Sequence, residues 1–92
     1  MKNRNTKYPL VLIEWEDSVG GRSGWKPIAD QPKETIIATS VGYLVHKDKK
    51  THVVFSHVYY LQEEEYEAIG QGDMRIPTSA IKRIVNLREH RK

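Results

Sequence analysis

The chain has 92 residues, of which 38% are hydrophobic, 15 are basic and 12 are acidic, giving a net charge of +3 and no cysteine. This length fits one small domain and leaves little room for an enclosed active site. The lack of cysteine excludes disulfides, a thiol nucleophile and thiolate metal ligands, and it favours a reducing, cytoplasmic setting. The apolar runs are too short for a secretory signal or a spanning helix, so we expect no membrane association.

Residues 10–15 are apolar and rich in strand-forming types, and they predict a first strand. Residues 17–32 contain several glycines and two prolines, which indicates a long loop around Trp25. Loops of this length in a small domain are typically functional or mobile. We expect the two tryptophans, Trp15 and Trp25, to fill the core.

Residues 35–46 and 51–61 have the β-branched and aromatic composition of strands, and the polar turn at 47–50 joins them into a predicted hairpin. Gly42 suggests a bulge or bend in the first of these strands. Both faces of residues 53–61 are substantially apolar, as expected for a central strand or for one whose outer face meets a partner.

Residues 63–69 favour about two turns of helix, which Gly70 and Gly72 would end. A short strand should then end at Pro77, followed by one helical turn over residues 77–80 and a closing strand up to residue 87. We therefore expect a flexible basic N-terminus at residues 1–8, one domain at 9–87 and a basic tail at 88–92.

The hairpin with its Val-Gly-Tyr-Leu-Val segment at residues 41–45, followed by Ile-Pro-Thr-Ser-Ala-Ile at 76–81, resembles an SH3-like or Sm-like small barrel. The resemblance covers roughly residues 35–87 and its motifs are generic. It implies an all-β barrel of about five strands, with one short helical turn before the last strand. A likeness of fold does not by itself imply a function.

The chain is also similar to short uncharacterised proteins of bacteriophages and prophages. The similarity rests on residues 15–17, the Gly24-Trp25 pair, residues 40–45 and residues 76–87. The chain departs from that pattern in the glycine-rich segment 18–24, which separates Asp17 from Trp25. The similarity implies an accessory role in an infected bacterial cytoplasm, and it carries over no catalytic residue.

The glycine-rich loop is the first candidate binding site. Its backbone N–H groups could face an anion, and Arg22 between two tryptophans could clamp a phosphate or stack on a base. The Gly-Lys-Ser/Thr pattern of a nucleotide phosphate loop is absent. The candidate residues for a ligand or partner are Trp15, Asp17, Ser18, Arg22 and Trp25.

A second candidate surface is cationic and suits a phosphate backbone. Tyr43, Tyr59 and Tyr60 would then stack on bases, although alternating tyrosines in strands are also ordinary packing residues. The basic residues of this candidate nucleic-acid surface are Lys47, Lys49, Lys50, Lys82, Arg83 and Arg88.

Metal binding and catalysis have less support. His46 and His52 flank the hairpin turn and His57 follows, but a zinc site needs three or four ligands, so we expect exposed histidines and no metal or cofactor. Ser40, Ser56 and His57 are not spaced as a catalytic set, and the acidic run 63–65 is typical of a solvated turn.

The sequence favours a non-enzymatic binding module whose partner is a protein or a second copy. The alternatives are a nucleic-acid-binding barrel and a protein that sequesters a small nucleotide-like ligand from host defence.

Overall fold

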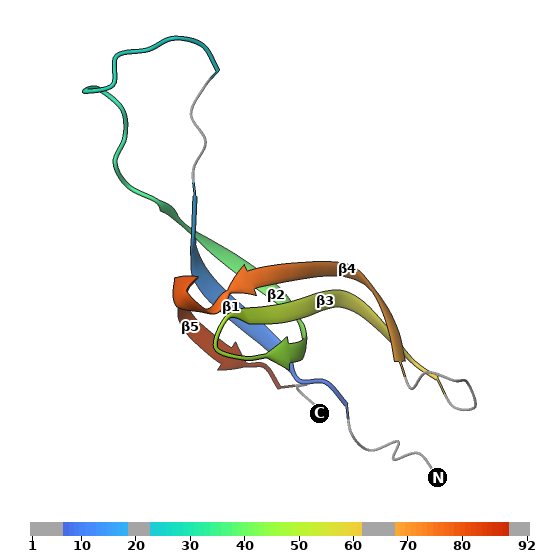
Figure 1. Ribbon diagram of the computed structural model, residues 1–92. Helices are drawn as coiled ribbons and strands as arrows, with labels where there is room; N and C mark the ends of the chain where they lie inside the picture. Colours follow the sequence, from blue (N-terminus) through green and yellow to red (C-terminus); the bar gives the residue numbers. More distant parts are fainter. Residues whose placement is uncertain (1–6, 19–22, 62–67, 89–92) are drawn as a thin grey trace.

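The computed structural model describes residues 7–18, 23–61 and 68–88, and these form an all-β protein (Figure 1). The expected all-β class and five strands are confirmed. The elements in chain order are β1 (Leu10–Asp17), β2 (Ile36–Lys47), β3 (Thr51–Tyr60), β4 (Ala68–Pro77), the 3₁₀ turn η1 (Thr78–Ala80) and β5 (Ile81–Asn86).

The five strands make one antiparallel sheet in the order β4-β3-β2-β1-β5. The prediction of a closed barrel is not met, because β4 and β5 form the two edges and no ladder joins them among the described residues. The η1 turn directs the chain away from β4, so that β5 pairs with β1, while β4 stays paired with β3 as far as Ala68.

A small core lies on one face of this sheet. Val11 and Ile13 alternate along β1, and Val54 of β3 and Ile76 of β4 complete the buried cluster. Trp15 packs against this cluster, which confirms the expectation that it fills the core. Its indole N–H donates to the Ser40 hydroxyl over 3.1 Å, so its polar atom is also satisfied.

Two local predictions need correction. Ala68 and Ile69, the end of the expected helix, begin strand β4, and the rest of that segment lies outside the described residues. The irregularity expected at Gly42 falls slightly later, where the β2–β3 register shifts between Leu44 and His46. Gly42 instead allows β2 and β3 to lie close together, because a Cβ at this position would lie 3.0 Å from the carbonyl oxygen of Phe55.

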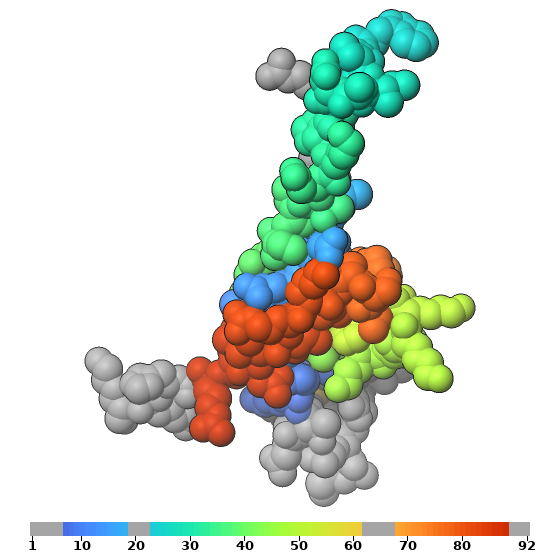
Figure 2. All heavy atoms as spheres, turned by 90° about the vertical axis from the view of Figure 1, so that its left-hand side faces the viewer, coloured from blue at the N-terminus to red at the C-terminus, as the bar shows by residue number. Residues whose placement is uncertain are grey.

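Between β1 and β2, residues 23–35 form a projection that we call the arm; it stands clear of the sheet (Figures 1 and 2). With it the molecule measures 62 × 33 × 26 Å, and its radius of gyration is 17.9 Å. A compact chain of this length would have a radius of gyration of about 12 Å. The predicted long loop is therefore confirmed over its described residues, and it is extended rather than folded onto the domain.

Candidate functional site

The arm presents its apolar side chains to solvent. Trp25 is as exposed as an isolated residue, at 105%, and Ile28 is 90% exposed. The expectation that Trp25 fills the core is wrong, because no core side chain covers it. A local turn next to these residues is held by Gln31, whose backbone N–H donates to Ile28 O over 3.3 Å and whose amide donates to Pro27 O over 2.7 Å.

The root of the arm is tied to the sheet. The hydroxyl of Thr35 donates a 2.8 Å hydrogen bond to Glu16, directly before the point where Asp17 pairs with Ile36 at the end of the β1–β2 ladder. The arm therefore leaves the sheet from a fixed position, and its side chains Trp25 and Ile28 are exposed.

The structure separates the residues of the predicted loop site. Trp15 lies against the core and Trp25 lies in solvent, so the two rings do not form a clamp. Asp17 ends β1, Ser18 is exposed just beyond it, and Arg22 falls outside the described residues.

The predicted cationic surface is partly neutralised. The Arg83 Nε donates to the Glu14 carboxylate over 2.8 Å, and Lys82 forms an ion pair with Glu16. Lys82 and Arg83 are consecutive in β5, so their side chains would normally point to opposite faces of the sheet. The register shift between Glu14 and Trp15 lets both reach the carboxylates of Glu14 and Glu16, which lie on one face of β1. The hydrogen bonds that Arg83 and Lys82 donate lower the pKa of Glu14 and Glu16, respectively. The bond that Arg83 donates to Glu14 also raises the pKa of Arg83.

The remaining members of that surface are dispersed. Lys47, Lys49 and Lys50 are exposed around the β2–β3 turn, and Arg88 is exposed after β5. Among the tyrosines, Tyr59 is exposed, Tyr43 is opposite Phe55 in the β2–β3 ladder, and Tyr60 faces Tyr8. The Tyr60 hydroxyl also accepts a 3.1 Å hydrogen bond from the Tyr8 backbone N–H.

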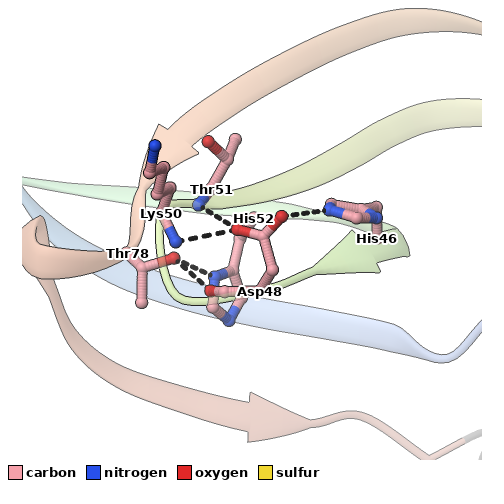
Figure 3. Close-up of polar contacts among 6 residues, drawn as sticks. All are labelled: His46, Asp48, Lys50, Thr51, His52 and Thr78. Atoms are coloured by element: carbon pink, nitrogen blue, oxygen red, sulfur yellow. Dashed lines mark hydrogen bonds and ion pairs between the residues drawn. The ribbon is translucent and has the colours of Figure 1, made fainter.

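The β2–β3 turn is organised by Asp48 (Figure 3). One carboxylate oxygen accepts the backbone N–H groups of Lys50 and Thr51 at 2.7 and 2.8 Å, and the other contacts the ring of His46 at 2.7 Å. The His46 hydrogen bond and the two backbone N–H groups hold the pKa of Asp48 at about 2. An Asp that accepts backbone N–H groups in this way is a standard device for fixing a turn.

His52, directly after this turn, is the one buried histidine among the three that the structure describes. It is 8% exposed, so the expectation of exposed histidines is wrong for it. Its Nδ1 lies 2.9 Å from the Thr78 hydroxyl oxygen, and that hydroxyl donates its one hydrogen to the backbone oxygen of Asp48, also at 2.9 Å (Figure 3). Nδ1 must therefore carry a hydrogen and donate to Thr78. Burial lowers the pKa of His52, which favours the neutral ring.

This assignment defines the chemistry of a cleft beside His52. The cleft has a volume of about 540 Å³ and lies between the end of the β2–β3 hairpin and the end of β5. Pro9, Leu44, Val45 and Ile84 give it apolar walls. Its polar lining residues are His46, Lys47, His52 and Asn86.

Sequence reasoning did not find this cleft. Its residues come from three strands and from the segment before β1, and only the sheet topology brings them together. No sequence motif marks the pairing of His52 with Thr78, because the two residues are 26 positions apart. Within the described part of the chain, no group of three or more His, Cys, Asp or Glu residues is placed to hold a metal ion.

No family model, curated protein or solved structure matches this chain. Across residues 7–18, 23–61 and 68–88, no helix is long and apolar enough to cross a membrane.

Proposed function

We propose that this chain is a non-enzymatic binding module that engages a protein partner through the arm. The observation that carries the proposal is the full exposure of Trp25 beside the exposed Ile28. Large aromatic side chains that add nothing to the packing of their own fold are typical anchors of protein interfaces. The fixed root of the arm at Thr35 and Glu16 supports presentation of this anchor from a defined position.

The amount of exposed surface supports the same proposal. The chain exposes 8210 Å², whereas a compact monomer of its mass would expose about 5,500 Å². A standard interface buries about 800 Å² per partner, so this excess provides ample surface for one.

The order of strands and the η1 turn before β5 support a relationship to SH3-like and Sm-like barrels. An accessory role in bacteriophage infection rests only on the resemblance of residues 15–17, 24–25, 40–45 and 76–87 to the pattern of phage and prophage proteins. Both belong to the proposal, and neither identifies the partner.

The proposal is tested by comparing the two tryptophans. Trp25→Ala should change the free energy of unfolding by no more than about 0.5 kcal/mol, because the side chain has no packing to lose. Trp15→Ala should cost about 2 kcal/mol or more, because it leaves a void against the core. Urea denaturation measures both. A loss for Trp25→Ala as large as that for Trp15→Ala would mean that Trp25 serves the fold and not a partner.

Nucleic-acid binding is the second candidate, and the observation that favours it is the exposure of Lys47, Lys49 and Lys50 at one turn. Fluorescence anisotropy of labelled single- and double-stranded oligonucleotides at two salt concentrations tests it. Phosphate contacts would give binding that weakens steeply with salt and is reduced by Lys49→Glu. Absence of binding at low salt would remove this candidate.

A further inference from the structure

The cleft beside His52 offers one unused hydrogen-bond acceptor. Because Nδ1 of His52 donates to Thr78, the lone pair of the neutral ring is on Nε2. None of the described residues donates to this nitrogen, and the ring itself lines the cleft. A ligand that occupies the cleft can therefore donate a hydrogen bond to Nε2 of a largely buried imidazole.

The remaining lining restricts that ligand further. Leu44 and Ile84, together with Pro9, give the cleft apolar walls, so the body of the ligand should be apolar. A flat aromatic group with a single N–H donor satisfies both conditions. The indole of tryptophan is such a group, because it is a donor and never an acceptor.

The chain itself presents an uncovered indole at Trp25. This indole does not reach the cleft of its own molecule in the structure. The arm leaves β1 after Asp17, whereas Pro9 precedes β1, so the two features lie at opposite ends of the β1–β2 ladder (Figure 1). Eight strand residues separate these ends by about 25 Å.

We propose that the cleft of one copy receives Trp25 from the arm of a second copy. The indole N–H donates to Nε2 of His52, and the ring lies against Leu44 and Ile84. This inference rests on the proposed function and names its partner as another molecule of the same chain. The contact joins the arm of one molecule to the cleft of another, and every molecule carries both an arm and a cleft.

The contact is tested with two complementary variants. Trp25→Ala removes the indole and keeps the cleft, while Ile84→Glu places a carboxylate in the cleft and keeps the arm. Ile84 lies on edge strand β5 and is 37% exposed, so part of its side chain is already accessible to solvent. Ile37→Glu, at an exposed position of β2 outside the cleft lining, is the matched control.

Sedimentation velocity over a range of concentrations gives the readout. The wild type and Ile37→Glu should associate as the concentration rises, and each of the two test variants should associate at least about tenfold more weakly. An equimolar mixture of Trp25→Ala and Ile84→Glu should form heterodimers and no larger species, because it contains only one complete pair of arm and cleft per two chains. Variants that associate like the wild type, or a mixture that stays monomeric, would overturn the inference.

A second measurement does not depend on Ile84→Glu remaining folded. Free indole titrated into Trp25→Ala should shift the NMR signals of the His52 ring and the Ile84 methyl groups and leave those of Ile37 in place. Unchanged signals at His52 and Ile84 would contradict the proposed cleft chemistry. A wild type that stays monomeric, combined with an unaltered stability of Trp25→Ala, would reject self-association while leaving a different protein partner as the function of the arm.

Discussion

The hydroxyl oxygen of Thr78 accepts a hydrogen bond from Nδ1 of His52 over 2.9 Å, and this bond ties η1 to the start of β3. The same hydroxyl donates to the backbone oxygen of Asp48, and the Thr78 backbone N–H donates to Lys50 O over 2.9 Å. One residue thus fastens the β2–β3 turn to the connection between β4 and β5. Together with the β1–β5 ladder, this fastening holds the two sides of the cleft.

We expect Thr78→Val to lower the free energy of unfolding by about 1–3 kcal/mol, because it leaves the Asp48 carbonyl and the His52 N–H without their partner. Thr78→Ser keeps the hydroxyl and should retain most of the stability. Urea denaturation of both variants gives the comparison. Equal losses would show that the methyl group of Thr78, and not its hydroxyl, is what matters.

The stability of the fold should depend on the protonation of His52. Burial lowers the pKa of this ring below its usual value of 6.5, so the unfolded chain binds the proton more readily than the folded chain. This contribution is therefore complete above the unfolded pKa and is lost as the pH falls below 6.5 and through the lowered folded pKa. His52→Gln can still donate to Thr78 and should flatten this part of the stability profile. His57→Gln, at an exposed position, should not.

The turn residue Asp48 should determine how the stability of the fold falls at more acidic pH. Its folded pKa of about 2 lies below the ordinary value of 3.8, so its stabilising effect is present above the ordinary value and is lost as the pH falls toward the folded one. Asp48→Asn can still accept the two backbone N–H groups but does not titrate. We expect this variant to show a shallower acid loss, and an exposed arm variant, Asp30→Asn, to follow the wild type. Acid unfolding monitored by circular dichroism distinguishes the profiles.

Gly72 is required by its backbone conformation. Its φ of +73° favours glycine, and a Cβ there would collide with the hydroxyl of Ser56. Gly72→Ala should destabilise the fold by about 1–3 kcal/mol. The double variant Ser56→Ala/Gly72→Ala removes the collision and keeps the strained φ, so it should recover part of the loss. Thermal unfolding that shows no recovery would assign the whole effect to the backbone.

The strands were predictable because alternation of apolar residues is a local signal. Residues 10–15, 35–46 and 51–61 closely match β1, β2 and β3, and the short helical turn before the last strand matches η1. Failure to close a barrel was not predictable, because ladder formation between the two edge strands depends on the curvature of the whole sheet. The same predicted strands and helical turn therefore fit both an open and a closed sheet.

The candidate site was predicted only in outline. The loop around Trp25 was identified from its glycines and prolines, but composition does not distinguish an apolar residue that fills a core from one that faces solvent. Trp15 and Trp25 show the difference, because only Trp15 alternates with buried positions of a strand. The cleft and the buried His52 arise from contacts between distant segments, which no local pattern encodes.

Presentation of Trp25 to solvent for binding is tested most directly by acrylamide quenching of its fluorescence in a Trp15→Phe variant. Trp25 is then the one tryptophan in the chain. In dilute, monomeric protein we expect quenching as efficient as for a free tryptophan, and we expect protection to develop when the partner, or a second copy at high concentration, covers the ring. Strong protection in the dilute monomer would contradict the account, because it would place Trp25 against its own fold.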